Sequence, residues 1–318
     1  MSLKNRRFLT AALVVSLYSQ IQIAGHGQPA LGVKIAYACW RGDNLEICVM
    51  DGDGGNQIRL TEDPAYDSEP SWSPDGGRIA FSRDHHIHVM DSDGRNLMEI
   101  VKNARGWDPA WSPDGTKIAY TRSQALKRQV WVMDPDGGNQ MLLTQWGENY
   151  DPAWSHDGVR IAFVSAKRHG GPEIYVMDSD GDNQVRITHD LAAKENPSWS
   201  PDSGWIAYEA RRDRTYQIFV VKTDGSGLTR RLTRNRPHKS YPAWSPDGTK
   251  IAYVTWNALF ATINLMTVDG EHLERLSENN DDTDLEPDWF YPAGRSVTPK
   301  ANFVTIWGEI KWPAASRR

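Results

Sequence analysis

Short apolar runs alternate with polar turn residues along the chain, and they recur in units of about 40–45 residues. Each unit contains Pro-x-Trp-Ser-Pro-Asp-Gly or a variant of it. The repeated tryptophans, 39 to 45 residues apart, are Trp72, Trp111, Trp154, Trp199, Trp244 and Trp289. Self-similarity at this period is typical of a propeller or a solenoid.

Four short segments follow one another in each unit. The first carries the tryptophan, the second reads Ile-Ala-aromatic as at 35–37, the third ends in Val-Met-Asp as at 49–51, and the fourth ends near Leu-Thr as at 60–61. Each segment is β-branched or aromatic and bounded by turn residues, which predicts a strand. Ser-Pro-Asp-Gly itself predicts a turn. Four antiparallel strands in each of six units predict an all-β fold, a six-bladed β-propeller.

The two ends of the repeat array predict how the ring closes. The first Ile-Ala strand has no tryptophan strand before it, and the last tryptophan strand has no Ile-Ala strand after it. We therefore expect one blade of three N-terminal strands (35–61) and one C-terminal strand (about 284–291), with no free edge between first and last blades. The propeller is predicted over 33–292. The β-prone extension 293–318 either packs on the fold or offers a strand to a partner.

The N-terminus has the pattern of an export signal. Three basic residues lie within the first seven positions, an apolar run of 11 residues extends from Phe8 to Tyr18, and small residues follow at 24–25. This predicts a signal peptide over 1–24 and a periplasmic or secreted protein that is not an integral membrane protein after cleavage. The run is short for a permanent transmembrane helix, and a retained membrane anchor is the alternative.

Charge and cysteine content narrow the function classes. The formal net charge of -5 argues against a nucleic-acid partner, which requires a basic face. The two cysteines, Cys39 and Cys48, fall on neighbouring strands of one predicted hairpin. Export permits a cross-strand disulfide, but the separation of the two side chains decides whether it forms. The sequence favours two reduced, half-buried thiols.

The repeat resembles a known family. The pattern Pro-x-Trp-Ser-Pro-Asp-Gly-x-x-Ile-Ala-Phe, followed by Ile-Tyr-Val-Met-Asp-x-Asp-Gly and clearest at 152–181, is similar to the TolB-type (WD-like) propeller repeat from residue 33 to about 292. The resemblance implies a periplasmic propeller that binds an envelope protein, as TolB binds a peptidoglycan-associated lipoprotein. TolB also has an α/β domain before its propeller, for which we expect no counterpart here. Propellers of this type serve many functions, so the resemblance specifies the fold more closely than the ligand.

The residue just before the proline of each tryptophan segment varies between units, and in four of the six it is acidic. These residues are Glu69, Asp108, Asp151, Asn196, Tyr241 and Glu286. If the tryptophan strand is the innermost one, as in related propellers, they recur around one mouth of the central channel. With the nearby Trp107 and Tyr150 they form the predicted ligand-binding channel mouth. Its loops add Asp67, Trp146 and Glu195, and the fifth loop is basic, with Arg234, Arg236, His238 and Lys239. Such a mouth suits a polar or peptide ligand. The alternative is that these acids only precede proline in solvated turns.

Two other motifs resemble metal sites. The Asp-x-Asp-Gly-x-Asn runs beginning at Asp51, Asp91, Asp134 and Asp178 have glycine at the fourth position, whereas a helical-hand calcium loop needs it at the sixth. They are interpreted as hairpin turns. The run His85-His86-Ile87-His88 would place two imidazoles on one face of a strand, and a solvent-exposed hairpin is favoured over a metal site.

These observations favour an exported, non-enzymatic binding or scaffold propeller, a monomer without a cofactor, whose channel mouth holds a protein segment or a cell-envelope component. No Ser/His/Asp elbow or phosphate loop supports covalent catalysis. The first alternative is a metal-dependent hydrolase or lyase. In six-bladed lactonases calcium lies in the channel, and Glu69, Asp151, Asn196 and Glu286 could imitate that arrangement. The second alternative is a structural protein engaged through 302–312.

Overall fold

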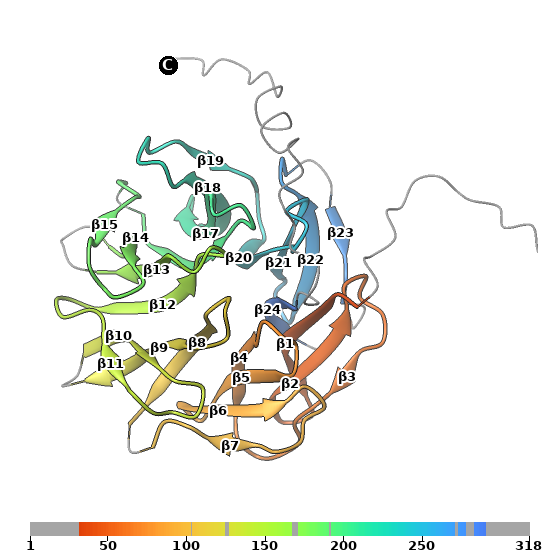
Figure 1. The fold of residues 1–318 in the computed structure, drawn as a ribbon. Helices are drawn as coiled ribbons and strands as arrows, with labels where there is room; N and C mark the ends of the chain where they lie inside the picture. Colours follow the sequence, from red (N-terminus) through yellow and green to blue (C-terminus); the bar gives the residue numbers. More distant parts are fainter. Residues whose placement is uncertain are drawn as a thin grey trace, which may run out of the picture.

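Every element in the described part of the chain is a β-strand. The computed structural model describes residues 32–102, 104–124, 127–166, 171–190, 192–270, 273–277 and 283–290. The expected signal peptide (1–24) and the C-terminal extension (293–318) lie outside these residues. Six separate sheets, each of four antiparallel strands, surround a central axis as blades (Figure 1). The predicted six-bladed propeller is therefore confirmed.

The strands of each blade have the predicted order from the axis outward. The innermost strands carry the repeated tryptophans; they are β4 (Asp67–Trp72), β8 (Gly106–Trp111), β12 (Asn149–Trp154), β16 (Lys194–Trp199), β20 (His238–Trp244) and β24 (Asp284–Phe290). The Ile-Ala strands come second, as β1 (Lys34–Arg41), β5 (Arg78–Arg83), β9 (Ile118–Gln124), β13 (Arg160–Ser165), β17 (Trp205–Arg212) and β21 (Lys250–Trp256). The third strands are β2 (Asn44–Asp51), β6 (His86–Asp91), β10 (Lys127–Met133), β14 (Glu173–Asp178), β18 (Thr215–Lys222) and β22 (Ala261–Thr267). The outer strands are short: β3 (Ile58–Arg59), β7 (Met98–Glu99), β11 (Met141–Leu142), β15 (Val185–Arg186), β19 (Thr229–Arg231) and β23 (Leu273–Arg275).

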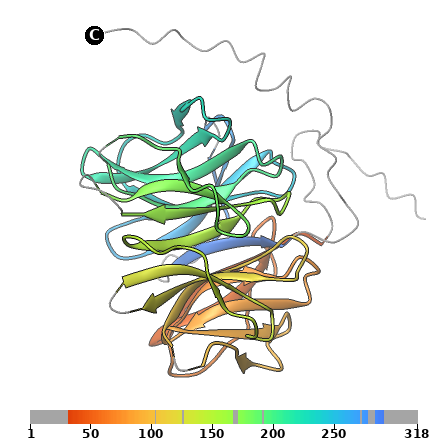
Figure 2. The same ribbon diagram turned by 60° about the vertical axis from the view of Figure 1, so that its left-hand side comes forward.

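One blade contains both ends of the propeller, as the repeat count predicts. We number the blades from this one: blade 1 has the order β24-β1-β2-β3, and blades 2 to 6 follow in chain order from β4 to β23. Strand β24 pairs antiparallel with β1, with Trp289 opposite Ile35. Figures 1 and 2 show this C-terminal strand, in blue, beside the N-terminal strands in orange. The ring is thus closed by main-chain hydrogen bonds between the two ends of the repeat array.

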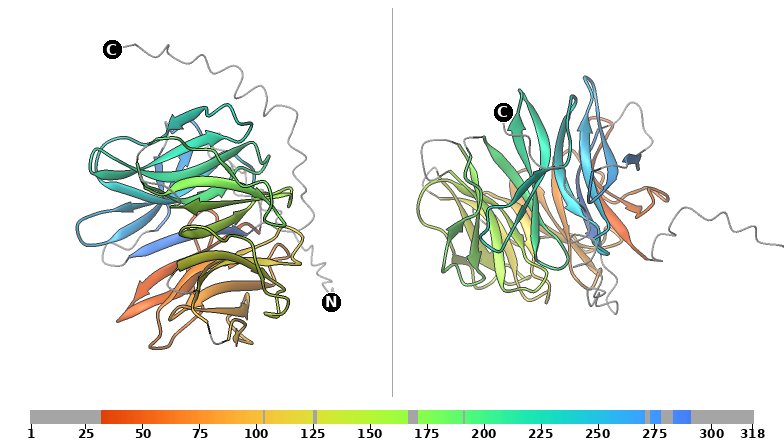
Figure 3. Two further views of the ribbon diagram at one scale, coloured as in Figure 1. Left: turned by 90° about the vertical axis from the view of Figure 1, so that its left-hand side faces the viewer. Right: turned by 90° about the horizontal axis from the view of Figure 1, so that it is seen from above.

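The hydrophobic core lies between blades. It consists of six clusters, one at each interface of neighbouring sheets. At the interface of blades 1 and 2, for example, Trp72 packs with Ile47 and Val49 of β2 and with Phe81 of β5. Figure 3 shows the twisted sheets facing one another around the axis. The repeated tryptophans are therefore framework residues.

Both repeated turns have the predicted geometry. In the first Ser-Pro-Asp-Gly turn, the Gly76 N–H donates to the Ser73 carbonyl oxygen at 2.9 Å, and the Asp75 carboxylate accepts the Ser73 hydroxyl at 2.6 Å. In the first Asp-x-Asp-Gly-x-Asn run, the Gly54 N–H donates to the Asp51 carbonyl at 2.8 Å. The Asp51 carboxylate accepts the Asn56 amide and the Asp53 carboxylate accepts the Gly55 N–H within the same turn, as expected for Asx-type turns.

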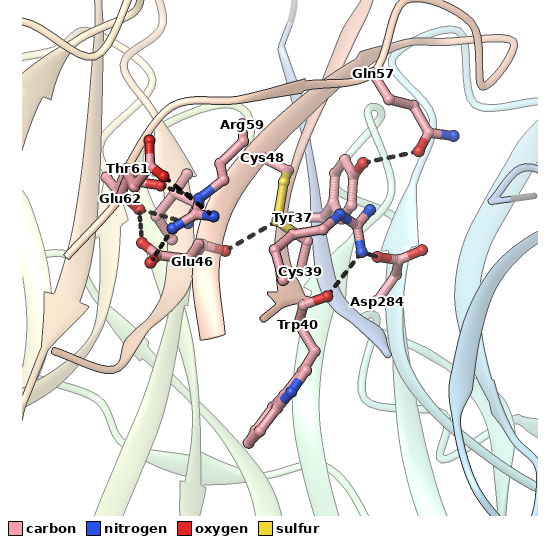
Figure 4. Close-up of a disulfide and its surroundings, with 12 residues drawn as sticks. Tyr37, Cys39, Trp40, Glu46, Cys48, Gln57, Arg59, Thr61, Glu62 and Asp284 are labelled. Atoms are coloured by element: carbon pink, nitrogen blue, oxygen red, sulfur yellow. Dashed lines mark hydrogen bonds and ion pairs between the residues drawn. A yellow bond between two sulfur atoms is a disulfide. The ribbon is translucent and has the colours of Figure 1, made fainter. Parts of the chain in front are cut away.

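The two cysteines form a disulfide, so the expectation of reduced, half-buried thiols is wrong (Figure 4). Both residues are almost fully buried. The β1–β2 register places Cys39 opposite Glu46 and Cys48 opposite Tyr37, which makes the cysteines diagonal neighbours on one face of the hairpin. Their Cα atoms are 5.9 Å apart, within the range that a disulfide bridges.

Candidate functional site

The six residues before the repeat prolines share one unusual backbone conformation. Their φ angles lie between 50° and 55°, in the left-handed region, and they are Glu69, Asp108, Asp151, Asn196, Tyr241 and Glu286. At each of them the inner strand bulges, because its register with the second strand shifts at this point. A bulge turns a side chain away from its regular direction. We call these residues the channel ring.

The side chains of the channel ring bond to the backbone of the next blade. The Glu286 carboxylate accepts the Glu69 N–H at 2.6 Å, and the Glu69 carboxylate accepts the Asp108 N–H at 2.7 Å. Further round, the Asp151 carboxylate accepts the Asn196 N–H at 3.2 Å. These carboxylates therefore link neighbouring blades at the axis.

This pattern of hydrogen bonds between blades changes where the ring residue is the amide Asn196. Asn196 is followed in the ring by Tyr241, whose N–H is accepted by the Glu209 carboxylate of β17 at 2.9 Å. In two other blades the equivalent residue is a hydroxyl that donates to the ring: Ser82 bonds Glu69 at 2.6 Å and Thr121 bonds Asp108 at 2.7 Å. The sequence interpretation missed Glu209. Its signal is that this position, just after Ile-Ala-aromatic, is a carboxylate in one unit only.

Burial raises the pKa values of carboxyl groups in and beside the channel ring. Burial raises the pKa of Glu286 to about 7 and the pKa of Glu209 to about 8. The pKa values of Glu69 and Asp151 are raised well above the usual range by burial first and then by the neighbouring Asp108 carboxylate. Burial at the axis therefore favours the protonated form of these carboxyl groups over a full set of negative charges.

All eight predicted mouth residues line one cavity along the axis. Its volume is about 1160 Å³, and the inner strands of all six blades form its wall, from the channel ring to the Ser-Pro-Asp turns. At the mouth, the Arg128 guanidinium lies over the Tyr150 ring, 3.7 Å from its centre, and the Trp107 indole N–H donates to His85 at 2.6 Å. Glu195 lines the same cavity. The mouth is thus aromatic and mixed in charge beside blades 3 and 4.

Other predicted candidates do not join this cavity. Asp67 is buried, and its carboxylate is bound by both ends of the Arg83 guanidinium at 2.7 and 2.6 Å. Trp146 is 78% exposed and lies outside the cavity lining. His86 contacts Glu99 at 3.2 Å at the edge of a hairpin. Over the described ranges, no three His, Cys, Asp or Glu side chains are grouped closely enough to hold a metal ion.

Comparisons with known proteins agree with this architecture. A family model described as TolB beta propeller domain matches residues 82–298, more than half of the chain. The structure of TolB from Acinetobacter baumannii has a TM-score of 0.70 and 24% identity; the match covers 80% of this chain and spans 66% of that chain. The structure of a putative TolB from Agrobacterium tumefaciens has a TM-score of 0.68 and 23% identity, with 81% and 99% of the two chains covered.

A more distant structure is an enzyme. An oligogalacturonate lyase in complex with manganese has a TM-score of 0.53 and 14% identity, over 74% of this chain and 72% of that chain. Identities this low show a shared fold alone. Among curated proteins, none matches the chain in sequence. In the part of the chain that the structure describes, no helix has the length and apolar character needed to cross a membrane.

Proposed function

Since the chain belongs to the TolB beta-propeller family, we propose that it is an exported, non-enzymatic binding propeller whose channel mouth holds a protein segment of the cell envelope. The observation that carries this proposal is the axial cavity of about 1160 Å³, which has aromatic and charged side chains at its mouth. Pockets of this kind combine apolar surface with a few fixed polar groups, as ligand sites do.

The mouth residues beside blades 3 and 4 are suited to a peptide. Trp107 offers a half-buried apolar surface. Arg128, which covers the buried Tyr150 ring, offers a donor group, and Glu195 offers an acceptor group. The Arg128 stacking on Tyr150 and the Trp107 bond to His85 restrict these side chains before a ligand arrives. Such preorganisation reduces the entropy lost on binding. A partner segment would therefore find a rigid mouth.

The channel ring supports a binding role better than a catalytic one. Its carboxylates accept backbone N–H groups of neighbouring blades, so one oxygen of each is already committed to the framework. A metal-dependent hydrolase or lyase would need charged carboxylates free to coordinate a cation. We therefore favour a function without a cofactor.

The disulfide supports the proposed location. Disulfides persist in oxidising compartments such as the periplasm and the extracellular space. The Cys39–Cys48 bridge is consistent with export, and we propose a periplasmic or secreted monomer. Its partner would be a protein or peptide of the envelope.

Site-specific photocrosslinking tests the proposed function. A photoreactive phenylalanine analogue at position 107 should crosslink a specific protein from a cell-envelope extract. The same analogue at position 146 is the matched control, because Trp146 is 78% exposed but does not line the cavity. We expect Trp107→Ala to weaken capture of that protein at least about tenfold, a typical effect of removing an interface tryptophan. Equal crosslinking from both positions, or none from position 107, would refute the proposal.

A further inference from the structure

A second hollow lies on the rim of the propeller between blades 5 and 6. Its volume is about 640 Å³. Its walls are the β17–β18 hairpin, the loop before β20 and the β21–β22 hairpin, which contribute Arg214, Tyr216, Arg236, His238 and Trp256. Glu209 and Tyr241, which are hydrogen-bonded to each other beside the channel ring, also line this hollow. The hollow therefore adjoins the channel mouth.

The hollow is rich in hydrogen-bond donors. Arg214 and Arg236 are both exposed, and within the described residues neither guanidinium makes a hydrogen bond or an ion pair. Other arginines of the same face are paired, as Arg83 is with Asp67. The His238 Nδ1 atom accepts the Tyr216 N–H at 3.1 Å, so the proton of the neutral imidazole lies on Nε2. These groups favour an anionic ligand.

The hollow also offers apolar surface. Tyr216 and Trp256 are half-buried in its wall, and the Trp256 indole N–H is held by the Ser240 hydroxyl at 2.6 Å. At the tip of the β21–β22 hairpin, beside the lining residues Asn257 and Ala258, Leu259 is 90% exposed. An exposed apolar side chain beside a hollow extends the surface that an apolar group can cover.

The one acid in the lining does not oppose an anion at neutral pH. Burial raises the pKa of Glu209 to about 8, so this carboxyl is mostly neutral at pH 7. Glu209 also has a structural role, because it accepts the hydrogen bond from the Tyr241 N–H. The net charge of the lining at pH 7 is therefore set by the two arginines.

We propose that this hollow binds a carboxylate joined to a flat apolar group, with Arg214 and Arg236 for the carboxylate and Tyr216 and Trp256 for the apolar group. A guanidinium pairs with a carboxylate through two parallel hydrogen bonds, which fixes its orientation as well as its charge. The C-terminal aromatic residue of a peptide has this chemistry. We assign that residue to the partner segment of the channel mouth, and this assignment, unlike the chemistry of the hollow, rests on the proposed function.

A small probe tests the chemistry of the hollow without a partner. N-acetyl-L-phenylalanine should bind the full-length protein at one site with a Kd on the order of 1 mM at pH 7, measured by NMR titration. N-acetyl-L-phenylalanine amide lacks the carboxylate, and N-acetylglycine lacks the ring. Each should bind at least about tenfold more weakly, because each loses one half of the recognition.

Variants locate the site. The double change Arg214→Gln and Arg236→Gln should weaken binding of the acid at least about tenfold. The control Arg95→Gln alters an arginine that is 83% exposed and far from the lining, and it should have no effect. No saturable binding to the wild type, equal binding of acid and amide, or an unaffected double variant would each overturn the proposal.

The proposal for the channel and the proposal for the hollow can be refuted independently of each other. Trp107→Ala should leave binding of the probe unchanged, because Trp107 does not line the hollow. If the arginine double variant lost the probe but still captured the envelope partner as the wild type does, the peptide assignment would be wrong and the channel proposal would stand. If the wild type bound the probe but crosslinked no protein from position 107, the channel proposal would fail alone.

Discussion

Replacing Glu209 by glutamine should make the stability of the protein less sensitive to pH. Glu209 is 4% exposed, its carboxylate accepts the Tyr241 N–H at 2.9 Å, and burial raises its pKa to about 8. The neutral acid is therefore the form that the folded state prefers. Glutamine has nearly the same shape, keeps an oxygen for the Tyr241 N–H and carries no charge at any pH.

The direction in which the free energy of unfolding changes with pH follows from proton linkage. In the unfolded chain the carboxyl loses its proton near the ordinary glutamate pKa of 4.5, whereas in the folded state it keeps the proton until about pH 8. Between these values the folded state binds more protons, so the free energy of unfolding falls as pH rises. Each tenfold difference in acid dissociation corresponds to about 1.4 kcal/mol, and the interval corresponds to at most about 5 kcal/mol. Structural relaxation and water in the channel reduce this, and we expect about 2–4 kcal/mol.

Urea unfolding at pH 5.5, 7.0 and 8.5, followed by tryptophan fluorescence, measures the effect. Wild type should lose stability over this range, and Glu209→Gln should lose about 2–4 kcal/mol less. Glu62→Gln is the matched control, since the Glu62 side chain is 86% exposed and its removal should leave the pH dependence of the wild type intact. Parallel stability curves for wild type and Glu209→Gln would refute the electrostatic reasoning.

Three further outcomes follow from the framework. Reduction of the Cys39–Cys48 bridge should lower the free energy of unfolding by about 2–4 kcal/mol, measured as urea unfolding with and without reductant; an equal midpoint in both would count against a stabilising disulfide. Gly137→Ala should lower the melting temperature more than Gly225→Ala, although both glycines have positive φ. A Cβ at 137 would lie 2.0 Å from a carbonyl oxygen of the preceding blade, whereas a Cβ at 225 would meet nothing within 4 Å. Ending the chain at residue 282 removes β24, so calorimetry should show a large loss of the cooperative transition; melting like the full chain would contradict closure of the ring.

The fold was predictable because the repeated residues occupy equivalent core positions in every blade. Each tryptophan and each Ile-Ala-aromatic strand fills the same place between blades, so six copies determine the number of blades. The incomplete first and last copies determine the split blade. These predictions depend on hydrophobic period and count, which the sequence contains directly.

The disulfide was also predictable in principle, from the turn between its two strands. Gly42 and Asp43 form a two-residue hairpin loop in which Gly42 has a φ of 78°, and Arg41 pairs with Asn44. A two-residue loop fixes the register of both strands. Counting outward from this loop makes Cys39 and Cys48 diagonal neighbours, close enough to be bridged.

The contacts of the channel ring were not predictable. A residue before proline is expected in the extended region, because the proline ring clashes with other conformations. All six ring residues instead have φ of 50° to 55°. A side chain that leaves the strand in this conformation reaches the next blade, and the hydrogen bond from the Asp108 N–H to Glu69 joins residues 39 positions apart. Only the assembled ring shows such a contact.

This arrangement divides the roles of repeated and unrepeated positions. The ring carboxylates accept the N–H groups of their neighbours through one oxygen each, so a ligand that competed for that oxygen would break contacts that hold blades together. An unpaired buried N–H costs about 1–3 kcal/mol, which penalises such a ligand. Within the described residues the guanidinium groups of Arg214 and Arg236 at the hollow make no such contacts, and these arginines do not recur between blades. Specificity is therefore expected to change through these loop residues while the ring keeps the blades in place.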